Sequence, residues 1–176
     1  MRHTFHTEQW IPFPAEEVFA FFANPENLPP LMPSTQRARI ERMMLISPDV
    51  HPANLRFDVA GAGSQLTISF CPIPLLPFRL HWDSAIVDFE WGRTFSDEQL
   101  QRGPFHYWKH RHSVRSEDRN GIVGAFVTDD LEYEVPLSAL GEVANKLFVH
   151  RQIRSIFAYR QSRLLDLLSG ASWVKP

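Results

Sequence analysis

The sequence has 176 residues, of which 44% are hydrophobic and 22% charged, values that are typical of one globular domain and exclude a disordered or fibrous chain. A formal net charge of -2 provides no positive field for a phosphate backbone, so no nucleic-acid partner is expected. Because no segment has the apolar length of a signal peptide or a membrane span and Cys71 is the only cysteine, we expect a cytoplasmic single domain over residues 1–176, without stable membrane insertion or disulfide.

The chain opens with a predicted strand followed by a short helix. Residues 3–11 alternate between apolar and polar side chains, as a half-buried strand does. Pro14 suits the first position of a helix, and the two glutamates after it suit the positive end of the helix dipole. Asn24 and Pro25 end this helix, and the prolines up to Pro33 allow only one further short helix.

Residues 34–135 predict a meander of antiparallel strands, because apolar and polar side chains alternate in runs that turn residues separate. Residues 47–63 are mixed in character, so we expect a loop there with at most a short strand. The predicted strands are residues 35–46, 64–71, 78–90, 93–100, 104–116 and 121–135.

One long helix is predicted from Ser138, a suitable N-cap, to about Ser169. Its apolar stripe consists of Leu140, Val143, Ala144, Leu147, Ile153, Ile156, Phe157, Leu164, Leu167 and Leu168. Four arginines fall largely off this stripe, which predicts a solvated face with ion pairs to the rim of the sheet or, as the alternative, a contact with anionic lipid. These arginines are Arg151, Arg154, Arg160 and Arg163.

This order of elements predicts an α+β fold in which a curved antiparallel sheet of about seven strands wraps around the long C-terminal helix. Two short helices follow the first strand. Such a sheet encloses a large volume, and a small-molecule pocket is expected between the sheet and the helix. The fourteen phenylalanines and five tryptophans supply enough aromatic area either to overfill a small core or to line a cavity.

The charged residues of the strands indicate which side chains face the predicted cavity. In the strand from Pro104, Lys109 and Arg111 mark the solvated face together with Phe105 and Tyr107. The opposite face carries His106, Trp108, His110 and His112. By the same argument, the inward residues of the predicted strands 78–90 and 121–135 are Phe78, Leu80, Trp82, Ser84, Ile86, Val127, Asp129, Leu131, Tyr133 and Val135.

Turn residues indicate how these strands are paired. A two-residue turn at Asn120-Gly121 places His112 opposite Asp129. A loop at Arg102-Gly103 would place Asp97 opposite Trp108, with Gln99 near His106 and Phe95 near His110.

Many polar groups on the concave face favour a pocket, since a closed apolar core would leave them unpaired at about 1–3 kcal/mol each. The residues predicted to bind ligand are Trp82, Ile86, Phe95, Asp97, Gln99, Trp108, His110, His112, Asp129, Leu131 and Tyr133.

Two further interpretations use the same residues. A zinc ion could be held by the three histidines with Asp129, although we predict no metal and no cofactor. Acid-base catalysis could use His110 or His112 with Asp129, Asp97 or Tyr133, and would suit aldol cyclisation or dehydration of a polyketone. No GxSxG, Walker A, GxGxxG or HExxH motif occurs, so common hydrolase, nucleotide-binding and zinc-protease activities have no support.

Four segments resemble the START-like (SRPBCC) superfamily, whose fold is the helix grip, over nearly the whole chain. "IPFPAEEVFAFFANPENLPPLMP" is similar to its opening segment, while "FSDEQLQRGPFHYWKHRH", "TDDLEYEVPLSALGEVAN" and "IRSIFAYR" resemble a bacterial cyclase/dehydrase-like branch. The resemblance implies a cavity for a hydrophobic ligand but no single reaction. His106 and residues 46–63 depart from the pattern. The signature positions it implies are Asp97, Gln99, Gly103, Pro104, Trp108, His110, His112, Asp129, Tyr133 and Pro136.

The sequence thus predicts a protein that binds a hydrophobic small molecule such as a lipid, a quinone or a polyketide-like aromatic, in the service of transport or sequestration. The alternative is a polyketide cyclase or dehydratase that uses the same cavity, and a third hypothesis is a scaffold with a vestigial pocket whose helix contacts an unknown protein partner. Turnover would separate the first two hypotheses, and bound ligand would argue against the third.

Overall fold

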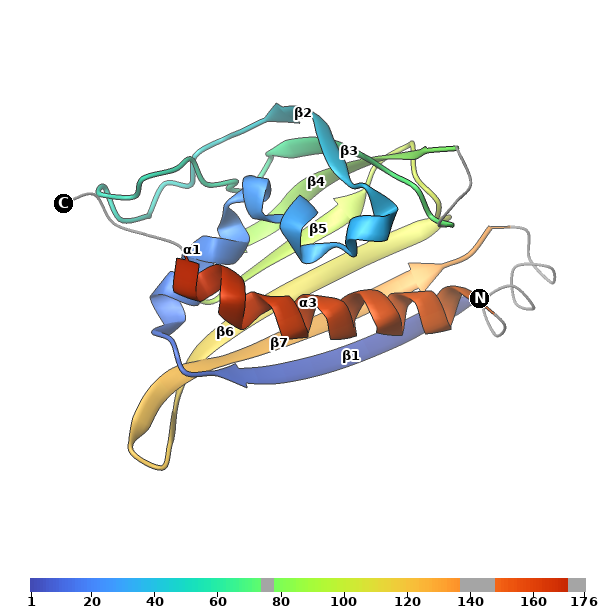
Figure 1. Ribbon diagram of the computed structural model, residues 1–176. Helices are drawn as coiled ribbons and strands as arrows, with labels where there is room; N and C mark the ends of the chain where they lie inside the picture. The colour runs from blue at the N-terminus through green and yellow to red at the C-terminus, as the bar shows by residue number, and fades with distance from the viewer. Residues whose placement is uncertain (74–77, 137–147, 171–176) are drawn as a thin grey trace.

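The computed structural model describes residues 1–73, 78–136 and 148–170. Its seven strands form one antiparallel sheet in the order β1-β7-β6-β5-β4-β3-β2, and α3 (His150–Gly170) lies across one face of this sheet, in front of β6 and β7 (Figure 1). The α+β helix-grip architecture predicted from the sequence is therefore confirmed. The strands are β1 (Arg2–Ile11), β2 (Arg39–Met44), β3 (Gln65–Phe70), β4 (Leu80–Glu90), β5 (Thr94–Gln99), β6 (Tyr107–Arg119) and β7 (Ile122–Glu134).

Short helical segments follow β1 and lie on the same face of the sheet as α3 (Figure 1). The first is α1 (Ala15–Ala23), and three single 3-10 turns come after it: η1 (Pro25–Asn27), η2 (Pro29–Leu31) and η3 (Ser34–Gln36). Pro14 is the N-cap residue and not the first helical residue, so the helix begins one residue later than predicted. The turn η3 and the left-handed Arg37, with φ of 48°, delay β2 until Arg39.

The hairpin between β6 and β7 has the register that the sequence predicts. Asn120 and Gly121 have φ of 56° and 80°, the left-handed conformation that a tight two-residue turn requires at both positions. Arg119 pairs with Ile122, and the ladder continues without a bulge to place His112 opposite Asp129. This hairpin fixes the relative positions of the two strands that carry most of the polar cavity residues.

The predicted register between β5 and β6 was wrong by two residues. Asp97 pairs with His110 and Phe95 with His112, because the connection between the strands is longer than the sequence indicated. The Gln99 side chain bridges this connection by two hydrogen bonds to the backbone of Phe105. Its Nε2 donates to Phe105 O at 2.6 Å, and its Oε1 accepts from Phe105 N at 3.2 Å. A Cβ on Gly103 would overlap this amide. A shift of two residues leaves the inward and outward faces of β5 unchanged.

The late start of β6 also changes which side chains at its beginning face inward. His106, predicted to face the cavity, lies in the connection and is exposed. Phe105, predicted to face solvent, instead packs against Trp82, Trp108 and Tyr133. The two predictions failed together, because strand alternation does not apply to residues that precede the strand.

The inward face of β4 follows the prediction from Leu80 onward. Phe78 precedes the strand and is 44% exposed, so its predicted inward position was wrong. A bulge between Ile86 and Asp88 interrupts the alternation, and both Ile86 and Phe89 pack against the core. The bulge thus turns the Phe89 ring inward as well.

Two hydrophobic clusters flank the middle of α3. One includes Leu164 and Leu168 with residues of α1, and the other contains Ile153 and Phe157 with residues of β6 and β7. The predicted N-cap at Ser138 and the first part of that helix fall in residues 137–147, outside the described residues. In the described ranges, no helix combines the length and the apolar character needed to cross a membrane.

Candidate functional site

A cavity of about 370 Å³ lies between the sheet and α3, near the lower end of the ~300–1,000 Å³ range for small-molecule sites. Its wall is formed by the end of α1, the turns η1 and η2, strands β3 to β6 and α3, and is mainly apolar. Seven of the eleven residues predicted to bind ligand lie in this wall: Trp82, Ile86, Phe95, Asp97, Trp108, His110 and His112.

The other four predicted residues lie outside the wall. Gln99 braces the connection before β6. Leu131 and Tyr133 belong to the hydrophobic cluster on the β6 and β7 side, and Tyr133 Oη lies 3.3 Å from His150 Nδ1. Asp129 is 4% exposed and contacts the cavity histidines from behind. These four residues support the wall instead of forming its surface.

Aromatic rings form one side of the cavity. The rings of Trp82 and Trp108 meet edge to face with centroids 4.6 Å apart, and Phe105 lies 4.8 Å from Trp108. Trp108 also donates its Nε1 proton to Asp97 Oδ2 at 3.2 Å. This bond ties the aromatic side to a polar cluster formed by Asp97, His110, His112, Asp129 and Arg160, and we call these five residues the charged cluster.

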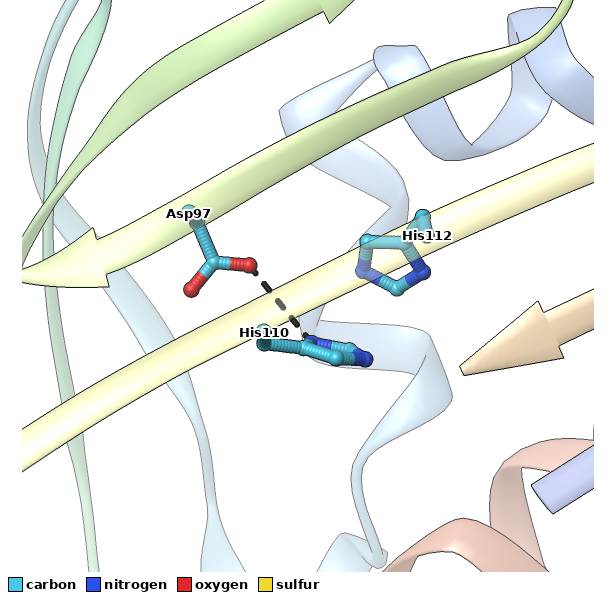
Figure 2. A group of neighbouring side chains, drawn as sticks. All are labelled: Asp97, His110 and His112. Atoms are coloured by element: carbon cyan, nitrogen blue, oxygen red, sulfur yellow. Dashed lines mark ion pairs between the residues drawn. The ribbon is translucent and has the colours of Figure 1, made fainter. Parts of the chain in front are cut away.

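His110 lies between the two carboxylates of the charged cluster, and Figure 2 shows the Asp97 carboxylate directed at its ring. Nδ1 is 3.5 Å from Asp97 Oδ1, and Nε2 is 3.1 Å from Asp129 Oδ1. Only the protonated ring can donate from both nitrogens. Burial lowers the pKa of His110, but the hydrogen bonds to Asp129 and Asp97 outweigh it, so the pKa is raised overall. His110 is therefore assigned as an imidazolium.

His112 has the opposite electrostatic character, although its ring centroid is only 3.9 Å from that of His110. Burial and then the charges of His110 and Arg160 lower the pKa of His112 to about 4. Its Nδ1 lies 2.6 Å from Asp129 Oδ1, which assigns the single proton of the neutral ring to Nδ1. Phe22 of α1 stacks on this ring with centroids 5.6 Å apart.

Both carboxylates of the charged cluster are ionised. Burial raises the pKa of Asp129, but Arg160, His112 and His110 together hold that pKa well below its usual value. Burial likewise opposes ionisation of Asp97, and the hydrogen bond and charge of His110 lower its pKa overall. Two negative carboxylates thus face two positive groups, His110 and Arg160, and the buried charges balance.

Arg160 was expected on a solvated face of α3, and this prediction was wrong. Its side chain is 12% exposed, lies in the cavity wall and places its guanidinium carbon 4.7 Å from the centroid of the Phe22 ring. The spacing of apolar residues in the sequence indicates this buried position. Residue 160 lies three residues after Phe157 and four before Leu164, on the buried stripe of the helix. The arginines at 151 and 154 are exposed as expected.

The metal site that the sequence analysis weighed, with three histidines, does not form, because His106 is exposed. The ligand atoms of Asp97, His110 and His112 do lie within 4.8 Å of one another, close enough to converge on one metal ion. However, each nitrogen of His110 faces a carboxylate, and the Arg160 guanidinium lies beside His112. A cation would have to displace the His110 proton and approach a fixed positive charge.

Comparisons with known proteins show that the fold has been seen before. No family model matches the chain, and no curated protein matches it. Many solved structures do, including TTHA0849 from Thermus thermophilus, with 16% identity, a TM-score of 0.65 and coverage of 97% of this chain and 99% of the other. Protein CV1439 from Chromobacterium violaceum has 11% identity, a TM-score of 0.62 and coverage of 96% and 98%.

A third similar structure is norcoclaurine synthase from Thalictrum flavum in complex with dopamine and hydroxybenzaldehyde. It has 14% identity, a TM-score of 0.59 and coverage of 98% of this chain and 90% of the other. At such identities the likeness establishes the fold alone. The chain therefore has the helix-grip fold that its sequence resemblance predicts.

Proposed function

We propose that residues 1–176 act as one ligand-binding domain that takes a hydrophobic, ring-containing small molecule into the cavity between the sheet and α3. The observation that carries this proposal is a cavity of about 370 Å³ whose wall is largely apolar and aromatic, with polar groups gathered in the charged cluster. A ring-containing ligand suits the tryptophan and phenylalanine rings on one side. The norcoclaurine synthase complex, whose two bound molecules are small aromatics, supports this ligand class by fold analogy only.

The protonation pattern favours binding over catalysis. A general base works best when its pKa is near the working pH, whereas the pKa of His112 is lowered to about 4. His110 has a proton to give, but both of its nitrogens are directed at carboxylates and not at the cavity. The cluster is therefore better suited to holding a polar group of a ligand than to moving protons.

Binding is tested with N-phenyl-1-naphthylamine, a neutral aromatic probe whose fluorescence rises in apolar surroundings. The wild-type protein should bind it at one site, and native mass spectrometry should detect the 1:1 complex. Ser84→Phe places a ring in the cavity wall and should abolish binding, whereas Ser116→Phe, the same change at an exposed position of β6, should leave it intact. Absence of binding by folded wild-type protein, or equal binding by the two variants, would refute the proposal.

A cyclase or dehydratase acting on a polyketone is the second candidate, and the observation that favours it is the contact of both His110 and His112 with the cavity. Its test is turnover of a poly-β-ketone thioester. Loss of product in His112→Ala and Asp129→Asn, with the naphthylamine probe still bound, would establish catalysis. Spontaneous product only, unchanged by wild-type protein, would exclude it.

A further inference from the structure

We infer that the ligand carries an anionic oxygen, such as a carboxylate, and that Arg160 receives it. This inference rests on the proposed function and specifies the class of ligand. The apolar part of such a molecule would occupy the aromatic side of the cavity, and its anionic end would lie against the charged cluster.

The first argument is that the Arg160 guanidinium lacks a good acceptor among the described residues. A guanidinium has five N–H donors and no acceptor. Its Nε is buried and makes no hydrogen bond within the described ranges. Its Nη2 is 3.9 Å from Asp129 Oδ1, beyond hydrogen-bond distance.

A closer polar contact, made with a described residue, does not satisfy this group. Nη2 lies 3.3 Å from Nδ1 of His112, yet that nitrogen holds the proton directed at Asp129 Oδ1, 2.6 Å away. Two donors cannot bond to each other. Since unpaired polar groups cost about 1–3 kcal/mol when water is excluded, an acceptor arriving from the cavity would stabilise Arg160.

The second argument is that the surroundings hold this cation in place while keeping it at the cavity wall. The ring centroid of Phe22 lies 4.7 Å from the guanidinium carbon, and that of Phe157 lies 5.8 Å from it. The two rings limit its rotation. The helix positions before and after Arg160 on the stripe, Phe157 and Leu164, are both buried. The guanidinium is therefore fixed in advance, and a ligand would lose little free energy in ordering it.

The third argument concerns charge. The two carboxylates are already balanced by His110 and Arg160, so an added anion makes the cluster negative by one unit unless a proton enters with it. His112 is the neutral group of the cluster, because burial and the charges of His110 and Arg160 lower its pKa to about 4. The groups that face it are Asp129 from β7, His110 from its own strand, Phe95 from β5, Phe22 from α1 and Arg160 from α3. An anion beside Arg160 would reduce the positive field that disfavours the imidazolium.

The test compares two probes that share one ring skeleton. 8-Anilino-1-naphthalenesulfonate carries an anionic group, and N-phenyl-1-naphthylamine lacks it. In Arg160→Met, which keeps the apolar contacts of the chain but removes the charge, the affinity for the sulfonate should fall about tenfold or more relative to that for the neutral probe. Arg154→Met, the same change at an exposed position of α3, should not alter the ratio.

A second measurement needs no variant and stays decisive if Arg160→Met does not fold. 2-Naphthoate should displace the neutral probe from wild-type protein at least about tenfold more effectively than its methyl ester does. Equal displacement by acid and ester, or an unchanged ratio in Arg160→Met, would overturn the inference while leaving hydrophobic binding intact. If the wild-type protein binds neither probe, the proposed function itself is refuted.

Discussion

At the scale of single residues, Asp129 organises the charged cluster. One of its carboxylate oxygens lies 3.1 Å from His110 Nε2, 2.6 Å from His112 Nδ1 and 3.9 Å from Arg160 Nη2. Three side chains that can be positive therefore depend on one negative atom. This dependence decides both the stability of the cluster and its response to pH.

Asp129→Asn should destabilise the protein by about 3 kcal/mol, because removing one partner of a buried ion pair leaves the others uncompensated. Asp97→Asn is the matched comparison and should cost less, about 1 kcal/mol, since the Asp97 side chain is 21% exposed and water can replace the lost charge. Urea unfolding at pH 7 measures both. Equal losses would mean that burial does not govern the energetics of the cluster.

The stability of the wild-type protein should fall as the pH falls from about 6.5 to 4. The pKa of His112 is about 4 in the folded protein and about 6.5 in an unfolded chain, so the unfolded state takes up this proton first. His112 thus contributes stability that is present above pH 6.5 and is lost towards pH 4, to a total of roughly 3 kcal/mol. The carboxylates add their own loss only near and below pH 4.

His112→Gln should flatten this pH dependence, as measured by urea unfolding at several pH values between 4.5 and 7. His81→Gln, at an exposed histidine, serves as the control and should keep the wild-type slope. An unchanged slope in His112→Gln would show that His112 is not buried in its neutral form.

At the scale of elements, close approach of two strands explains one glycine of β7. A Cβ at Gly124 would lie 2.5 Å from the carbonyl oxygen of Ile11 and 2.6 Å from the Trp10 ring. Gly124→Ala should therefore cost about 1–3 kcal/mol through forced movement of β1. Gly170→Ala, at the end of α3 where a Cβ meets nothing, should be nearly neutral. Thermal unfolding of the two variants measures this difference. Equal midpoints would contradict the close packing of β7 against β1 at Gly124.

Sequence predicted those elements whose local signals were strong. The alternation of Lys109 and Arg111 with apolar neighbours gave the faces of β6 correctly, and Asn120-Gly121 gave the register that joins His112 to Asp129. The register of β5 failed because no sequence rule anticipates that the Gln99 amide bonds to the backbone of Phe105. A side chain that hydrogen-bonds to the backbone in this way produces no periodic pattern in the sequence.

The candidate site was predicted incompletely for a different reason. Charged residues were assigned to solvent by type, which worked for Arg154 and failed for Arg160, whose position on the helix stripe was outweighed by its charge. Tyr133 and Leu131 were predicted as ligand contacts because they face inward. Facing inward does not distinguish the cavity surface from the packing behind it, because that distinction depends on how far α3 lies from each strand.

At the scale of the whole molecule, the cavity is a void that the fold maintains between two hydrophobic clusters. A ligand that fills it binds only the folded state, so at a free concentration of 100 times its dissociation constant it should add about 2.7 kcal/mol to the free energy of unfolding. N-phenyl-1-naphthylamine at that concentration should raise the midpoint of thermal unfolding of the wild type but not of Ser84→Phe. Equal shifts in both would place the probe outside the cavity.

The two sides of the cavity are built differently. Asp97, His110 and Asp129 stand on three adjacent strands, β5, β6 and β7, joined by continuous backbone pairing. The facing side consists of the end of α1, single-turn helices and α3. Parting the sheet would break a row of backbone hydrogen bonds at once, but displacing a 3-10 turn breaks few. Exchange of a guest with solvent should therefore proceed through the helical side, at a rate set by those turns, while the ionised groups stay in register throughout.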